Sequence, residues 1–177
     1  MRLKGKPGGP KFELHASLAG RLYDHQRDGV RWMWGLQLVG RGGILADDMG
    51  LGKTLQAAAF ATGLLRSGAA KRVLILAPTT LLPHWAKEFE KCGLKHGQPL
   101  FKDYAGTQSE RSRQLKACTT GRGVLLTSYG LVTSRAIELG APADQDFAEP
   151  TAKREGRGPA PKGFAGAFRP ACIATDE

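Results

Sequence analysis

Short, uniformly apolar runs alternate along this chain with segments of helical periodicity, and this alternation limits the possible folds most. The clearest predicted strands are Arg72–Ala77, which is apolar from Val73 onward, and Val124–Thr127. A strand that is apolar at every position must be covered on both faces. Helical patterns of 9 to 14 residues separate the strands, at 53–66, 81–92 and 109–117. The sequence therefore predicts an α/β fold, in which a parallel sheet is flanked by helices.

Weaker patterns predict the remaining elements. We expect a helix over 22–38, a short strand at Gly43–Ala46, a weak strand at Pro99–Phe101 and a short strand over 171–175. Right-handed connections between parallel strands place all strand-to-helix loops at one edge of a sheet. Open α/β sheets bind their ligands at that edge.

Composition divides the chain into four parts. Residues 1–11 are rich in Gly, Pro and Lys and are expected to be a flexible leader. Residues 12–140 carry the predicted strands and helices. Residues 141–170 are rich in Ala, Gly and Pro with scattered basic residues, which is typical of a linker or insert. Residues 171–177 are expected to form a short buried strand that ends in two carboxylates.

Overall composition excludes several classes of protein. The chain has 177 residues, and its formal net charge is +10. No apolar run approaches the roughly 20 residues that cross a bilayer, so we expect no membrane association. The three cysteines form no Cys-x-x-Cys pair, which argues against a zinc ribbon. The excess of positive charge favours a polyanionic partner such as nucleic acid.

The most informative motif is a Gly-rich loop that precedes a predicted helix. Gly50 and Gly52 allow backbone N–H groups to approach phosphate oxygens closely. Lys53 can reach the β- and γ-phosphates of a nucleotide, and the Thr54 hydroxyl can bind Mg²⁺. The general phosphate-loop pattern has a further glycine at the position of Asp47. The loop therefore predicts a nucleoside triphosphate site with one departure from the general pattern.

The absence of asparagine excludes two classes of nucleotide-binding protein. A small GTPase needs an Asn-Lys-x-Asp guanine-reading motif, and this chain contains no Asn. A protein kinase needs a catalytic-loop Asn, which is excluded for the same reason.

Four segments resemble motifs of the Swi/Snf-type ATPases, which are superfamily-two double-stranded DNA translocases and chromatin remodelers. Residues 47–56 resemble motif I, in which Asp at the first position is the family's own variant. Residues 22–30 resemble the Q motif, 76–89 resemble motif Ia, and 124–129 resemble the motif that follows. Within the family, the loop region is most similar to the excision-repair-like and PICH group. The resemblance implies the first RecA-like lobe of a two-lobe motor, with ATP and Mg²⁺ as cofactors.

The resemblance also implies roles for particular residues. Gln26 would read adenine, Lys53 would act in catalysis, and Thr54 would bind Mg²⁺. Asp176 would hold Mg²⁺ through water and Glu177 would orient the attacking water, if these residues are a motif II cut short. The expected ATP contacts from the loop are Asp48, Met49, Gly50, Leu51, Gly52, Lys53, Thr54 and Leu55.

Residues after two strands are expected to contact phosphates of double-stranded DNA or nucleosomes, as the resemblance implies. They are Pro78, Thr79, Thr80, Ser128 and Tyr129. The family's second lobe and its arginine fingers are not found in the chain, so we expect weak ATP binding and essentially no turnover from it alone. A nuclear protein of chromatin remodelling or DNA repair is implied. Two alternatives remain open: a non-catalytic ATP- or DNA-binding module, and a P-loop ATPase that acts on proteins.

Overall fold

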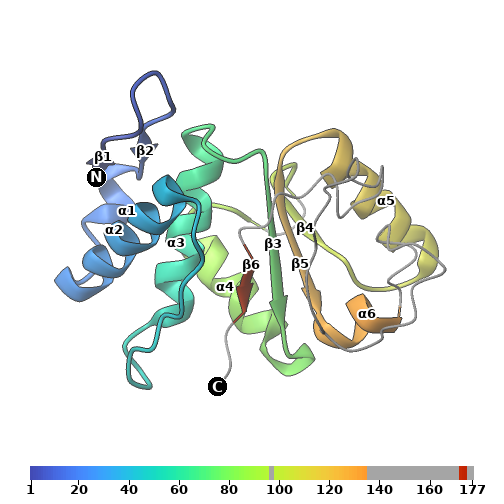
Figure 1. The fold of residues 1–177 in the computed structure, drawn as a ribbon. Helices are drawn as coiled ribbons and strands as arrows, with labels where there is room; N and C mark the ends of the chain where they lie inside the picture. The colour runs from blue at the N-terminus through green and yellow to red at the C-terminus, as the bar shows by residue number, and fades with distance from the viewer. Residues whose placement is uncertain (96–97, 135–171, 175–177) are drawn as a thin grey trace, which may run out of the picture.

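A four-stranded parallel sheet forms the centre of the computed structural model, which describes residues 1–95, 98–134 and 172–174. The strand order is β4-β5-β3-β6 (Figure 1). The strands are β3 (Arg72–Ala77), β4 (Phe101–Asp103), β5 (Gly123–Ser128) and β6 (Cys172–Ala174). The predicted α/β fold with a parallel sheet is confirmed.

The strand register brings the carboxyl ends of three strands to one edge. Ala77 at the end of β3 lies opposite Ser128 at the end of β5. On the other side of β3, Leu76 lies opposite Ala174 of β6. Segments that leave these strands therefore start side by side at this edge.

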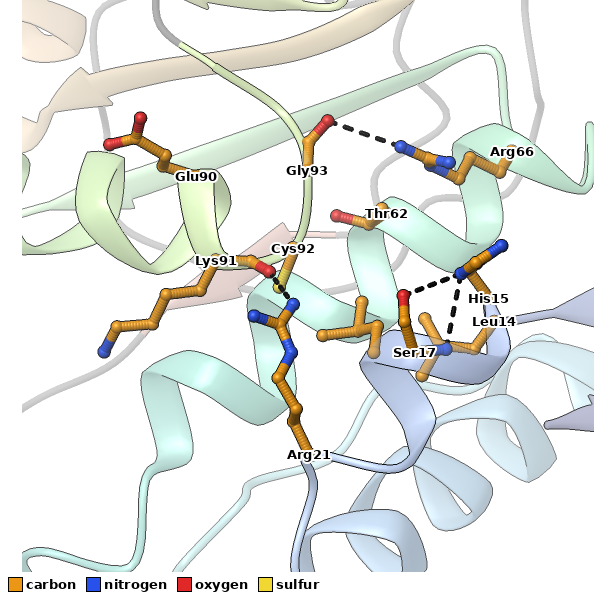
Figure 2. A pocket seen from close by; sticks show the side chains of 11 residues that line it. Leu14, His15, Ser17, Arg21, Thr62, Arg66, Glu90, Lys91, Cys92 and Gly93 are labelled. Carbon is orange, nitrogen blue, oxygen red and sulfur yellow. Dashed lines mark hydrogen bonds between the residues drawn. The ribbon is translucent and has the colours of Figure 1, made fainter.

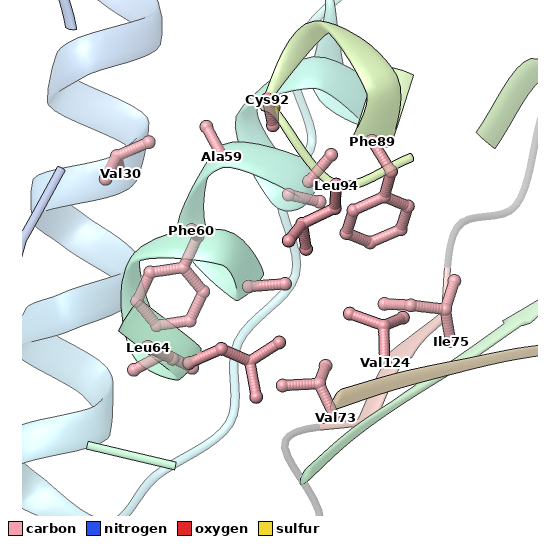
Figure 3. Packing of buried hydrophobic residues seen from close by; sticks show 14 of the residues in the cluster. Val30, Ala59, Phe60, Leu64, Val73, Ile75, Phe89, Cys92, Leu94 and Val124 are labelled. Carbon is pink, nitrogen blue, oxygen red and sulfur yellow. The ribbon is translucent and has the colours of Figure 1, made fainter. Parts of the chain in front are cut away.

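Helices cover both faces of the sheet. Alternate residues of β3 point to opposite faces, and they join two separate apolar clusters. Val73 and Ile75 pack in the larger cluster with α3 (Lys53–Arg66) and α4 (Leu82–Lys91) (Figure 3). Leu74 packs in the smaller cluster, which includes residues of α5 (Gln108–Thr120) and α6 (Tyr129–Ser134). β5 is buried at every position, whereas β3 has one fully buried face and one half-buried face, at Arg72, Leu74 and Leu76.

The N-terminal region packs on the outer side of α3. It contains α1 (Ala16–Ala19) and α2 (Asp24–Val39), and α2 lies against α3 (Figure 1). The first turn after β3 is a short 3₁₀ helix, η1 (Thr79–Leu81). Of the predicted helices, α3 has the expected bounds and α2 begins two residues later than expected.

Residues 1–11 differ from the expected flexible leader. β1 (Arg2–Leu3) pairs antiparallel with β2 (Phe12–Glu13), and the amino group of Met1 donates to the Leu14 carbonyl at 2.8 Å. Phe12 explains the attachment, because its buried ring packs against Trp34 and Phe60. The Phe12 ring anchors the hairpin to the core although its strands are only two residues long.

The predicted strand at Gly43–Ala46 is wrong. Residues 41–48 have no regular secondary structure, and they pair with no strand in the part of the chain that the structure describes. Ile44 is 86% exposed, so the apolar pattern here buries little surface. Two glycines before Ile44 also disfavour a strand. The predicted linker at 141–170 lies outside the described residues.

Two cysteines are buried as free thiols. Burial raises the pKa of Cys92 to about 12 and that of Cys118 to about 11, because a thiolate is poorly solvated in the core. Among the residues that the structure places, no helix has the length and apolar character needed to cross a membrane.

Candidate functional site

The Gly-rich loop before α3 depends on two glycines with left-handed backbone conformations. The φ angle is +87° at Gly50 and +77° at Gly52, which other residues rarely adopt. A Cβ atom at position 50 would meet nothing within 4 Å, so only the backbone angle requires glycine there. A Cβ atom at position 52 would lie 2.5 Å from Nε2 of Gln26. Gly52 is therefore required both for its backbone angle and for the close approach of Gln26.

The start of α3 presents free backbone donors to this loop. Gly52 is the N-cap residue and no side chain caps the helix. The first backbone bond of the helix runs from Gln56 N–H to the Gly52 carbonyl at 3.0 Å. The N–H groups of Lys53, Thr54 and Leu55 consequently have no partner within the helix. Such N–H groups and the positive end of the helix dipole suit a phosphate group.

Lys53 spans the loop. Its Nζ donates to the carbonyl of Asp47 at 2.9 Å and to that of Asp48 at 3.3 Å. These bonds hold the positive charge against the loop backbone that precedes α3. Thr54, the predicted Mg²⁺ ligand, follows Lys53 in the first turn of α3 and is half-buried. These groups fit the triphosphate of a nucleotide. Backbone N–H groups and a lysine can bind the phosphates, and a threonine hydroxyl can bind Mg²⁺.

Side chains from two helices converge on the carbonyl of Leu51. This oxygen accepts from Gln26 Nε2 at 3.1 Å and from Gln56 Nε2 at 3.4 Å. It also lies 3.2 Å from Nε2 of His25, which donates when that nitrogen carries the ring proton. The loop is thus fastened to α2 and to the first turns of α3. Sequence reasoning assigned no loop contact to His25 or Gln56. Both lie in segments that resemble family motifs, but a motif does not show which loop atom a side chain reaches.

The amide of Gln26 has partners at both ends. Its Oε1 accepts from the Tyr23 N–H at 3.1 Å, and its Nε2 donates to the Leu51 carbonyl. The side chain is only 5% exposed. One further hydrogen bond remains available at each end, since a primary amide has two donors and its oxygen two lone pairs. Adenine reading by Gln26 stays a prediction.

The predicted DNA-contacting residues gather at the carboxyl edge of the sheet. Thr79 and Thr80 are exposed in η1, directly after β3. Ser128 is only 5% exposed, and its hydroxyl accepts from the Leu131 N–H at 3.4 Å. Pro78 and Tyr129 are half-buried and follow the paired ends of β3 and β5. The threonines are therefore the most accessible of the five, and the DNA role stays a prediction for all of them.

The predicted motif II residues, Asp176 and Glu177, lie outside the described residues. β6 ends just before them, at Ala174, and its partner at that end is Leu76. Within the described ranges, no cluster of three or more His, Cys, Asp or Glu side chains is arranged to hold a metal.

A separate pocket lies between α1, α3 and α4 (Figure 2). Arg21 and Arg66 line it, and they donate to the carbonyls of Lys91 and Gly93. Arg66 ends α3, whereas the Gly-rich loop precedes the same helix. A helix of 14 residues is about 21 Å long, so this pocket is distinct from the loop site.

A Gly-rich loop that opens a helix beside a parallel sheet defines the class of phosphate-loop nucleotide-binding domains. The chain belongs to the SNF2-related domain family, whose model matches residues 25–148. It is 46% identical over 129 residues to Protein CHROMATIN REMODELING 24 of Arabidopsis thaliana, covering 72% of this chain and 12% of that protein. It is 36% identical over 135 residues to DNA excision repair protein ERCC-6-like of Homo sapiens, covering 76% of this chain and 11% of that protein.

A solved structure supports the same assignment. The SWI2/SNF2 ATPase core of Sulfolobus solfataricus in complex with dsDNA matches with a TM-score of 0.52 and 28% identity. The match covers 63% of this chain and 22% of that one. The resemblance to Swi/Snf-type ATPases is thus confirmed. The chain spans only a small part of the length of the relatives that it matches.

Proposed function

We propose that this chain is the ATP-binding lobe of a DNA-dependent ATPase that moves along double-stranded DNA, in chromatin remodelling or DNA repair in the nucleus. The main support for this proposal is the structure of the loop. Gly50 and Gly52 have left-handed backbone angles, no side chain caps α3, and Lys53 reaches across the loop. The similarity to proteins named for chromatin remodelling and excision repair, and to a DNA-bound ATPase core, supports the wider role.

The proposed nucleotide lies along the loop. Backbone N–H groups of Lys53, Thr54 and Leu55 would donate to phosphate oxygens, and the Lys53 ammonium would balance the negative charge of the β- and γ-phosphates. The Thr54 hydroxyl would bind Mg²⁺, which neutralises charge on the phosphates when bound. Loop residues Asp48, Met49 and Leu51 are exposed around this path.

We also propose that the 177 residues by themselves turn over ATP very slowly. ATPases of this kind use an arginine finger worth on the order of 10³–10⁵ in rate. In the Swi/Snf-type ATPases, the arginine finger comes from a second lobe. A DNA-stimulated, Lys53-dependent rate close to that of complete enzymes would contradict this proposal.

ATP binding can be tested directly on the chain by titration with a fluorescent ATP analogue. We expect Lys53→Ala to weaken binding by about 10- to 100-fold, because a charge-assisted bond contributes about 1.5–3 kcal/mol. Lys71→Ala is the matched control, since Lys71 is an exposed lysine just before β3, at the opposite edge of the sheet. Equal affinities for the two variants would overturn the proposed site.

A further inference from the structure

Gln56 has no role in the proposed nucleotide contacts, yet it is the most buried polar side chain near the loop. It lies one turn into α3, and its side chain is 0% exposed. We propose that Gln56 is a positioning residue that holds the Asp47 carboxylate and thereby fixes the phosphate loop. This inference rests on the proposed function, since it assigns Gln56 to the same ATP site.

The contacts of the Gln56 amide determine its orientation. Nε2 donates to Oδ2 of Asp47 at 2.8 Å and to the Leu51 carbonyl at 3.4 Å. The reverse orientation would place the amide oxygen against a carboxylate oxygen and a carbonyl oxygen, which repel it. Oε1 consequently remains buried without a hydrogen-bond partner in the described structure. A buried, unpaired acceptor is unfavourable, so the Asp47 contact must outweigh this cost.

A glycine in the middle of α2 makes room for this arrangement. A Cβ atom at position 29 would overlap Oε1 of Gln56 and lie 3.1 Å from its Cδ. The Gln56 amide therefore rests between the backbone of α2 and the start of the loop. Displacing it from the α2 side would disturb the same contacts as removing its amide.

Holding Asp47 has two consequences for phosphate binding. A carboxylate at the beginning of a phosphate loop repels a polyanion if it turns toward the ligand. The bond from Gln56 keeps this carboxylate directed at α3. The backbone carbonyl of Asp47 also accepts from Lys53 at 2.9 Å, so the position of Asp47 helps to set that of the Lys53 ammonium.

The test is a double-variant cycle on the full chain, using Gln56→Met, Asp47→Ala and the combination. Methionine keeps the length and unbranched shape of glutamine without its donors. Amide hydrogen exchange of residues 47–52 should be about tenfold faster in Gln56→Met. In the Asp47→Ala background the same change should alter exchange by less than about twofold, because the partner is already absent. ATP affinity should follow the same pattern, with a loss of about tenfold only when Asp47 is present.

Thermal unfolding, measured in parallel, shows whether each variant is folded. Gly29→Ala provides a second route, because it displaces the Gln56 amide from α2 and should also speed exchange in the loop. Unchanged loop exchange in Gln56→Met would overturn the proposal, and so would an equal increase in both backgrounds, which is the result of a packing role. If exchange is coupled as expected but the wild type binds no ATP, the positioning role is supported and the proposed function fails.

Discussion

At the scale of single residues, the site depends on close approaches that only particular side chains allow. Gly52 is the clearest case, because its backbone angle and the amide of Gln26 leave no room for a methyl group. Gly68, at the end of the same helix, provides a contrast. Its φ angle is +73°, yet a Cβ atom there would meet nothing within 4 Å.

We expect Gly68→Ala to lower the free energy of unfolding by about 1–2 kcal/mol through backbone strain alone. Gly52→Ala should cost more, because it adds a clash with Gln26, and it should also weaken ATP binding. Urea denaturation of both variants measures the two costs. If the two substitutions cost the same and ATP binding is unaffected, Gln26 is not packed against Gly52 as described.

Site residues whose contacts lie within a few positions could be predicted from the sequence more readily than residues whose contacts are distant. Gly50, Gly52 and Lys53 act within a loop of a few residues, so their spacing is visible as a motif. His25 reaches the Leu51 carbonyl across 26 positions, and no periodic pattern encodes such a contact. The role of a residue like His25 depends on how α2 packs, which only the folded chain determines.

At the scale of elements, α5 is a polar helix whose N-terminus is capped by side chains. The Thr107 hydroxyl accepts from the Glu110 N–H at 3.3 Å, and the Glu110 carboxylate accepts from the Thr107 N–H at 2.8 Å. The Thr107 hydroxyl also donates to Oε2 of Glu110 at 2.7 Å, and this bond, together with the weaker effect of the Thr107 N–H, lowers the pKa of Glu110. This reciprocal pair is a capping box. The helix buries few residues, so we expect the cap to contribute much of its local stability.

Thr107→Ala should lower the free energy of unfolding by about 1 kcal/mol at pH 7. Because the folded pKa of Glu110 lies below its unfolded value, the carboxylate's contribution is present above the unfolded pKa. It is lost as the pH falls through the folded pKa. The cost of Thr107→Ala should therefore shrink in acid, which denaturation at a series of pH values measures. Ser112→Ala, an exposed change in the same helix, should show no such pH dependence.

Elements with a strong apolar pattern could be predicted, and those held by a few contacts between residues distant in the sequence could not. β3 has the predicted bounds, since its apolar residues pack on both faces of the sheet, with one face buried and the other half-buried. The hairpin of β1 and β2 was missed because its strands are too short for any period. It is attached by the Phe12 ring and by a bond from Trp34 Nε1 to the Lys4 carbonyl, which join residues far apart in the sequence. Residues 43–46 have a strand-like composition, but no strand within the described chain pairs with them.

At the scale of the whole molecule, a share of the positive charge is engaged by the backbone. Several arginines donate to carbonyl groups, many of them at the C-terminal ends of helices, where a cation is favourable. These arginines are Arg21, Arg27, Arg66, Arg72, Arg111 and Arg122. The net charge of +10 therefore overstates the charge that is free to contact a polyanion.

Because these arginines bind backbone carbonyls, we expect that replacing one of them can lower stability without weakening DNA binding. Arg122 joins the segment before β5 to the Leu65 carbonyl of α3, so Arg122→Ala should lower the melting temperature by several degrees. It should leave the affinity for duplex DNA within about twofold, while the affinity of the wild type falls steeply as salt is raised. Binding measured by fluorescence anisotropy at several salt concentrations tests both expectations. Salt-independent or undetectable binding would favour an ATPase that acts on proteins.

The two carbonyl contacts of Lys53 have a consequence for how tightly any anion can be held. The ammonium already has oxygen partners in Asp47 and Asp48. An ammonium has three donors, so one N–H remains for an arriving phosphate, which then competes with the two peptide oxygens for the others. The peptide oxygens that compete with a phosphate also hold the charge that attracts it in place, so the same two contacts both limit and prepare anion binding.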